Sequence, residues 1–142
     1  MERGREASVI VCDDVRFEVT GKLVIVGVYT ADISIVSDEQ PTPQLQFLFR
    51  AECDINDPFA TIRFEVTLPG SEPIVAESKS LGPPPSVSAG RTRISIYQLI
   101  SVPGAVLRPG KILARVVHEK GEIPVSATWI TKVEPTPIPD PA

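Results

Sequence analysis

The sequence predicts one all-β domain, an antiparallel β-sandwich of eight or nine strands with little or no helix. Three observations predict it. Apolar and polar residues alternate with a period of two in several short runs. Turn-forming residues separate these runs at intervals of roughly 8–12 residues. No stretch of about ten or more residues shows the 3.6-residue period of an amphipathic helix.

The alternation is clearest in residues 44–53 and 61–68. In the first run the apolar side chains lie on one face and the polar ones on the other, with Leu48 as the exception. The second run has no exception. Each strand should therefore bury one face and expose the other. Residues 54–58 have the composition of a turn, so we predict that the two strands form a hairpin.

Other turns predict further pairings. We expect a hairpin around Gly21, another around Pro109 and Gly110, and a third around residues 119–122. The last strand alternates through Trp129, which we expect in the core. Residues 91–96 alternate as well, and the pattern breaks at 97–100, where we expect a bulge or one helical turn.

Proline marks the boundaries of these elements. The chain has 15 prolines in 142 residues, about twice the usual share of ~5%, and they gather between the apolar runs. We expect a β-sandwich domain over residues 1–134, a polyproline-like loop at 81–85 and a proline-rich, semi-rigid tail over residues 135–142.

Charge and composition argue against several functions. A net charge of −4 and the absence of a basic stripe argue against direct binding to nucleic acid. No run reaches the ~18–20 apolar residues of a membrane span, and no apolar region typical of a signal peptide follows the charged start. We therefore expect a cytoplasmic protein. Cys12 and Cys53 should be core thiols there, since a disulfide requires their strands to be neighbours.

Two segments resemble known proteins. The pattern Pro109-Gly110-x-Ile112-x-Ala114-x-Val116, followed by a turn and a last strand, resembles the end of immunoglobulin-like sandwiches. The opening block resembles that of a bacterial family of small, helix-poor proteins of unknown function, and the matching motif reads Cys12-Asp13-Asp14-x-Arg16-x-Glu18, then Gly21-Lys22 and Gly27-x-Tyr29. This second resemblance implies a bacterial source and one domain, and it implies no catalytic residue.

Asp13, Asp14 and Arg16 form a dense polar cluster between apolar strands. One interpretation is a small metal or anion site; the other is a strand end where Arg16 pairs with an acid such as Glu18. Two adjacent aspartates in a strand point to opposite faces, so they cannot share one metal ion.

Asp54 and Asp57 have the spacing of acids in a calcium loop. The segment lacks the central glycine and the later glutamate of an EF-hand, so an ordinary turn explains it equally well.

Catalytic motifs are missing from the sequence. His118 is the only histidine, which excludes a multi-histidine metal site, and its register places it at the core edge or toward solvent. The chain has no G-x-S-x-G motif, glycine-rich phosphate loop or C-x-x-C pair. We therefore expect no enzyme and no cofactor.

Two strands are apolar on both faces. The second face of residues 23–29 carries Val24, Val26 and Val28, and that of residues 111–118 carries Leu113 and Val117 around an arginine. A sandwich strand needs only one buried face, so the second is either covered by the proline-rich loop or binds a partner.

We therefore predict a non-catalytic module that binds a protein partner or forms a homodimer. The alternative is a site for a small ligand or divalent metal, including an enzymatic one, at a loop end that gathers five side chains: Asp13, Asp14, Arg16, Asp54 and Asp57.

Overall fold

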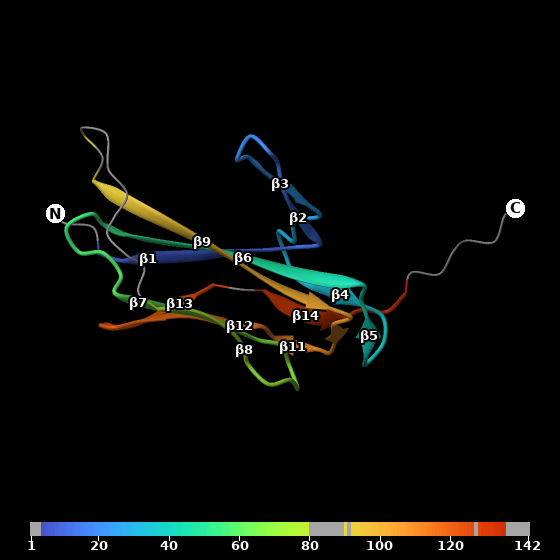
Figure 1. The fold of residues 1–142 in the computed structure, drawn as a ribbon. Helices are drawn as coiled ribbons and strands as arrows, with labels where there is room; N and C mark the ends of the chain where they lie inside the picture. Colours follow the sequence, from blue (N-terminus) through green and yellow to red (C-terminus); the bar gives the residue numbers. More distant parts are fainter. Residues whose placement is uncertain (1–3, 80–89, 91, 127, 136–142) are drawn as a thin grey trace, which may run out of the picture.

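The protein is built from strands. The computed structural model describes residues 4–79, 90, 92–126 and 128–135, and this part of the chain holds fourteen strand segments and no helix (Figure 1). In chain order the strands are β1 (Glu6–Cys12), β2 (Asp14–Phe17), β3 (Leu23–Val26), β4 (Ile33–Ile35), β5 (Gln40–Pro41), β6 (Gln44–Asp54), β7 (Thr61–Thr67), β8 (Ile74–Lys79), β9 (Arg93–Pro103), β10 (Val106–Leu107), β11 (Gly110–Lys111), β12 (Leu113–His118), β13 (Gly121–Val125) and β14 (Trp129–Lys132).

The number of segments exceeds eight or nine because some runs break into short pieces that join different sheets. Residues 106–118, for example, form β10, β11 and β12, which pair in three separate sheets. The loop expected at 81–85 and all of the expected tail except Pro135 lie outside the described residues. In the described part of the chain, no helix is long and apolar enough to cross a membrane.

Two antiparallel sheets lie one above the other and enclose the core (Figure 1). The first, which we call the β6 sheet, has the order β1-β6-β9; the second, the β7 sheet, has the order β13-β12-β7-β8. The rings of Phe49 and Phe64 meet between them with centroids 5.3 Å apart. The all-β sandwich predicted from the alternation is therefore confirmed.

Three smaller sheets complete the fold. β2 and β3 form a hairpin that stands on the outer side of the β6 sheet, while β11-β14-β4 and β10-β5 lie together at one end of the sandwich (Figure 1). β4 and β14 run parallel, which brings residues about a hundred positions apart in the chain side by side. Their buried isoleucines extend the main core at this end.

The predicted hairpin of residues 44–53 and 61–68 is wrong. These strands are β6 and β7, and they belong to opposite sheets. The connection between them crosses from one layer to the other. Alternation shows that each strand buries one face, but it does not show whether two such faces lie side by side or opposite each other. Here they lie opposite.

Two other local predictions are also wrong. The strands around Pro109 and Gly110 do not pair, because β10 joins β5 and β11 joins β14. Residues 97–100 form neither a bulge nor a helical turn; they continue β9, whose register with β6 is unbroken from Arg93 to Pro103. The alternation of apolar and polar residues breaks there because Leu99, an apolar residue, faces outward and packs against a second apolar cluster.

The hairpin around Gly21 is confirmed, with Gly21 at φ 83°. The turn near residues 119–122 is confirmed too, but the strand that pairs with β12 is β13 (Gly121–Val125) and not the expected run 125–131, most of which lies in β14 and pairs elsewhere. The expectation of a buried Trp129 is wrong, since its side chain is 53% exposed. The chain leaves the β7 sheet after Val125 and joins β4 as β14, which turns Ile130 inward and Trp129 toward Lys111.

β6 is buried on both faces. Its inner face lies in the main core, and on its outer face Leu48 is only 4% exposed. The hairpin of β2 and β3 covers this outer face, where Cys12 and Val15 form a second apolar cluster with Leu48. The one apolar exception in the alternation of residues 44–53 therefore marks the place where the hairpin packs.

The two cysteines lie on neighbouring strands but far apart. β1 pairs with β6, and Cys12 lies opposite Gln46, seven positions from Cys53 along β6. At ~3.3 Å per residue this corresponds to about 23 Å, well beyond disulfide reach. Both thiols are free and buried.

Packing of the hairpin on β6 gives a testable prediction. Replacing Leu48 with alanine should cost about 2–4 kcal/mol of unfolding free energy, because it empties a buried site beneath the hairpin. The same change at Leu113, which is 55% exposed, should cost less than about 0.5 kcal/mol. Urea unfolding of both variants measures the difference; equal costs would contradict this packing.

Candidate functional site

The base of the hairpin is built from the residues of the opening motif. The Tyr29 hydroxyl donates to Asp13 Oδ1 at 2.8 Å, and the Asp13 N–H donates to the Val26 carbonyl at 3.1 Å. The Tyr29 N–H in turn donates to the Val11 carbonyl at 2.9 Å. Asp13 thus joins the end of β1 to the chain that follows β3.

Gly27 makes this contact possible. Its φ of 69° lies in the left-handed region, and a Cβ at this position would lie 2.2 Å from Asp13 Oδ2. Any other residue would push the Asp13 carboxylate away from Tyr29. The glycine of the Gly27-x-Tyr29 motif is therefore required for packing at the hairpin base.

Burial, together with the hydrogen bond to Asp13, raises the pKa of Tyr29 to about 12. The phenol therefore stays protonated at neutral pH and remains a donor. Because Asp13 Oδ1 already accepts the hydrogen bond from Tyr29, Asp13 acts here as a structural hydrogen-bond acceptor.

A buried glutamine fixes the hairpin to the β6 sheet. Gln46 is 6% exposed; its Oε1 accepts the Val15 N–H at 2.6 Å and its Nε2 donates to Ser101 Oγ at 2.8 Å. Nearby, Gln44 Nε2 donates to the Asp13 carbonyl at 3.1 Å. The hairpin base is therefore held by several directional contacts as well as by apolar packing.

The outer face of the hairpin combines both kinds of predicted residue. Arg16 pairs with Asp14 at 3.0 Å, not with Glu18. In the register of β2 and β3, Arg16 lies opposite Val24 and Asp14 lies opposite Val26. The structure thus brings two residues of the predicted polar cluster onto the same face as two valines of the predicted interaction surface.

Exposed apolar side chains are concentrated on this hairpin. Of the twelve large apolar side chains exposed in the described residues, five lie between positions 17 and 28. We call them the hairpin surface: Phe17 (68% exposed), Val19 (107%), Val24 (38%), Val26 (43%) and Val28 (46%). Val24 and Val26 lie on the outer face of the hairpin with Arg16, whereas Phe17 lies at the tip end of β2 on the face of Val15 and Leu23, and Val19 lies in the turn. Figure 1 shows that this turn points away from the β6 sheet.

The other two predicted surface residues lie elsewhere. Leu113 and Val117 are on β12, in the outer face of the β7 sheet, on either side of Arg115. Arg115 pairs with Glu122 at 2.8 Å and also with Glu65, so this face carries charges that neutralise each other. Leu113 lines a shallow hollow of about 330 Å³ there. These residues do not extend the hairpin surface.

The five side chains of the alternative ligand site are not brought together. Asp13 and Asp14 lie beside Gln44 at one end of β6, whereas Asp54 is at the other end, about 33 Å away for ten residue steps. Asp54 accepts the Asn56 N–H at 2.8 Å, as in an ordinary turn. Within the described residues, no three His, Cys, Asp or Glu side chains are placed to hold a metal ion.

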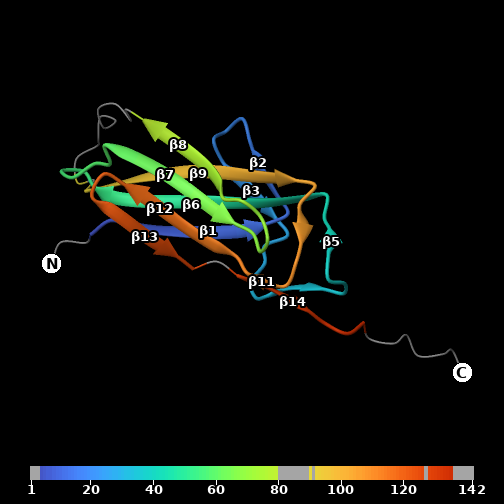
Figure 2. The same ribbon diagram turned by 90° about the horizontal axis from the view of Figure 1, so that it is seen from below.

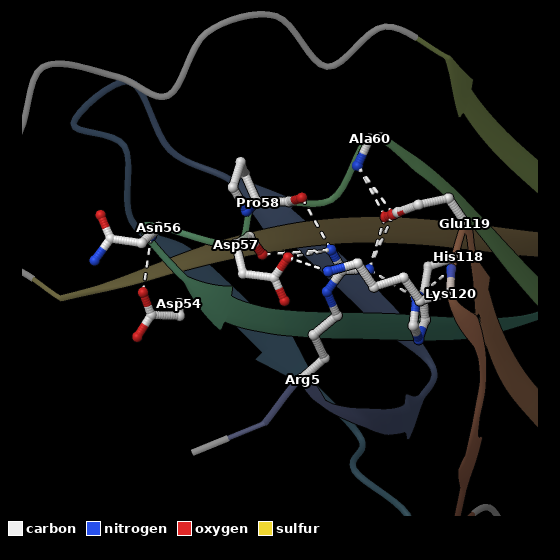
Figure 3. Close-up of polar contacts among 9 residues, drawn as sticks. All are labelled: Arg5, Asp54, Asn56, Asp57, Pro58, Ala60, His118, Glu119 and Lys120. Atoms are coloured by element: carbon white, nitrogen blue, oxygen red, sulfur yellow. Dashed lines mark hydrogen bonds and ion pairs between the residues drawn. The ribbon is translucent and has the colours of Figure 1, made fainter. Parts of the chain in front are cut away.

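Asp57 belongs to a different cluster, centred on Arg5 (Figure 3). The Arg5 side chain is 8% exposed, and its guanidinium lies 4.7 Å from the ring centre of Phe59. Its Nη1 donates to Glu119 Oε1 at 2.6 Å, and its Nη2 to Asp57 Oδ1 at 3.3 Å and to the Pro58 carbonyl at 3.0 Å. We call this cluster the Arg5 clasp, because it joins the start of β1, the β6–β7 crossover and the β12–β13 turn.

His118 completes the clasp as a neutral ring. Its Nδ1 accepts from Arg5 Nη1 at 2.7 Å and from the Lys120 N–H at 3.2 Å, so the ring proton is on Nε2. Burial lowers the pKa of His118, and the charge of Arg5 lowers it further. His118 is at the core edge, as its register predicted.

The acids of the clasp remain ionised. The hydrogen bond from Lys120, at 2.5 Å, lowers the pKa of Asp57, and Arg5 adds to the effect. Burial opposes the charge of Glu119, but the Ala60 N–H and Arg5 outweigh it and lower the pKa of this group as well. With two acids, two bases and a neutral histidine, the clasp balances its own charge and acts as a structural tie.

Sequence reasoning missed Arg5, although a signal was present. Arg5 has the same parity as Ala7, Val9 and Val11, the inward side chains of β1. Continuing that alternation one step toward the N-terminus places Arg5 at the core edge.

No protein-family model, curated protein or solved structure matches this chain. The resemblance of the opening block to a bacterial family of unknown function therefore stays a prediction. What the structure adds is the physical role of the motif, whose residues form the turn and the base of the hairpin.

The close approach at Gly27 can be tested by mutation. Gly27→Ala should cost about 2–3 kcal/mol, because it strains a left-handed residue and displaces Asp13 from Tyr29. Gly104 is the matched control: its φ is 62° and its Cβ would contact nothing within 4 Å, so Gly104→Ala should cost only about 1 kcal/mol of strain. Thermal and urea unfolding measure both; a smaller effect at Gly27 than at Gly104 would refute the proposed role.

The clasp predicts a pH dependence. The folded pKa of His118 is below its unfolded value, so its contribution to stability is complete above about pH 6.5 and is lost as the pH falls toward the folded value. Unfolding free energy should therefore fall between pH 7.5 and 5.5, where this lone histidine is the side chain that titrates. His118→Asn, which retains an acceptor, should flatten the profile. An unchanged slope in this variant would show that the effect has another source.

Proposed function

We propose that this protein is a non-catalytic β-sandwich module that binds a protein partner through the hairpin surface. The observation that carries the proposal is the contrast between the two ends of the hairpin. Its base is fixed by Gln46, Asp13 and Tyr29, while Phe17 and Val19 near its tip are exposed. A two-stranded hairpin alone is only marginally stable, so the anchored base keeps the tip in a defined position.

Energetics favour a binding role for this surface. Fully burying an exposed Val or Phe side chain is worth about 1.5–3 kcal/mol, so Phe17 and Val19 would contribute most on binding, and the three half-buried valines less than half of this value each. The Asp14–Arg16 pair beside Val24 and Val26 offers charged groups at the edge of the apolar area. Apolar centres with polar rims are typical of protein interfaces.

We also propose that the protein is cytoplasmic and bacterial, and the following observations support this and the non-catalytic role. The ionisable side chains of the Arg5 clasp and of the hairpin base hydrogen-bond to one another, as is usual for structural clusters. Cys12 and Cys53 are free, buried thiols, as is usual in a reducing compartment. The resemblance of the opening block favours a bacterial source.

Site-specific cross-linking tests the proposal. We would place the photoreactive residue p-benzoylphenylalanine at Val24 and irradiate the protein in an extract of its source cells. A defined cross-linked product should form, and excess unlabelled protein should suppress it. The double variant Val24→Lys/Val26→Lys should compete about tenfold less well or worse, because binding would bury two lysines in an apolar contact.

Val75 provides the matched control. It is 47% exposed but lies on β8 in the opposite sheet, so the same photoreactive residue there should not give the product. Identical products from both positions, or full competition by the double variant, would overturn the proposed surface. Circular dichroism should show that all variants remain folded.

A further inference from the structure

β9 is one of the two outer strands of the β6 sheet, and β1 is the other. β9 runs over eleven residues, Arg93–Pro103, and pairs with β6 along its whole length. Figure 2 shows β1 and β9 on opposite sides of β6. In the part of the chain that the structure describes, no strand pairs with the other edge of β9.

β9 has a longer stretch without charge or proline than the other outer strands of the two main sheets. Natural edge strands carry prolines or charges that discourage pairing with another chain. β13 contains Pro124 and β8 contains Glu77, while β1 is only seven residues long and its one charge, Glu6, is at its first residue. β9 begins with Arg93 and ends with Pro103, but the nine residues between them contain neither a charge nor a proline and include three isoleucines, a valine and a tyrosine, which favour strands.

We propose that β9 pairs with β9 of a second copy of this chain, in antiparallel orientation, to form one continuous six-stranded sheet. Antiparallel pairing of identical strands has two-fold symmetry, so the contact closes as a dimer. Charge favours this orientation: Arg93, the one charged residue of the strand, would lie at opposite ends of the pair, about 33 Å apart. Parallel pairing would place the two arginines side by side.

Tyr97 would lie near the centre of this contact. It faces outward, is 54% exposed and is one residue from the middle of the strand. The two-fold axis therefore brings the Tyr97 side chains of both copies close together, where aromatic pairs across strands contribute about 0.2–1 kcal/mol. The contact uses the edge of β9, not the hairpin surface, so it goes beyond the proposed binding function.

Sedimentation equilibrium over a range of protein concentrations tests the dimer. The wild-type chain should dimerise, and Tyr97→Lys should raise the dissociation constant about tenfold or more, because it places like charges across the axis. Leu113→Lys is the matched control, since Leu113 is 55% exposed on the other sheet; it should leave the constant unchanged. Val24→Lys/Val26→Lys should also leave it unchanged, which separates this test from that of the hairpin surface.

Cysteine scanning along β9 gives a second readout. Ser95→Cys, Tyr97→Cys and Ser101→Cys would be oxidised separately, with Cys12 and Cys53 out of reach at 0% and 1% exposure. Antiparallel pairing predicts that disulfide dimers form fastest at the position nearest the axis and more slowly away from it. A monomer at all concentrations, equal rates at all three positions, or equal weakening by Leu113→Lys would overturn the proposal.

Discussion

The fold depends on the exclusion of water from both faces of β6. On the inner face, Phe47 and Phe49 fill the space between the two sheets; on the outer face, Leu48 and Gln46 are buried as well. A sandwich strand would normally leave its outer face wet. Here the hairpin of β2 and β3 must cover it, and a buried glutamine amide would cost about 1–3 kcal/mol without partners. Val15 and Ser101 supply those partners, so one side chain decides where the hairpin sits.

This arrangement explains the structural role of the opening motif. Asp13 and Tyr29 hydrogen-bond to each other, and Gly27 leaves room for the Asp13 carboxylate, where the hairpin base joins the end of β1. Apolar packing and hydrogen bonds at the base of the hairpin offset the conformational entropy that is lost when the hairpin becomes ordered. The tip contributes little to that packing and is free to carry apolar side chains for another purpose. Because the fold does not need the exposed side chains at the tip for its stability, they are available for binding.

The two ends of the sandwich are stabilised by different physical means. At one end, short strands add isoleucines to the core. At the other, Arg5 joins three segments through charge-assisted hydrogen bonds, which are stronger and more directional than neutral ones. Arg5 is buried in this clasp, and its charge is balanced locally. The closed clasp and the exposed hairpin tip therefore differ in kind: one completes the fold, and the other extends beyond it.

The sequence by itself determined the properties that depend on neighbouring residues. Alternation identified the strands and their buried faces, Gly21 marked the hairpin turn, and the valines of residues 23–28 indicated a second apolar face. Only the tertiary structure decided which strands are neighbours, and it placed β6 and β7 in opposite sheets, Trp129 at the surface and the candidate acids at opposite ends of β6. Alternation with a period of two shows which side chains share a face of the strand. It does not state what lies against that face, because this depends on contacts between residues that are distant in the chain.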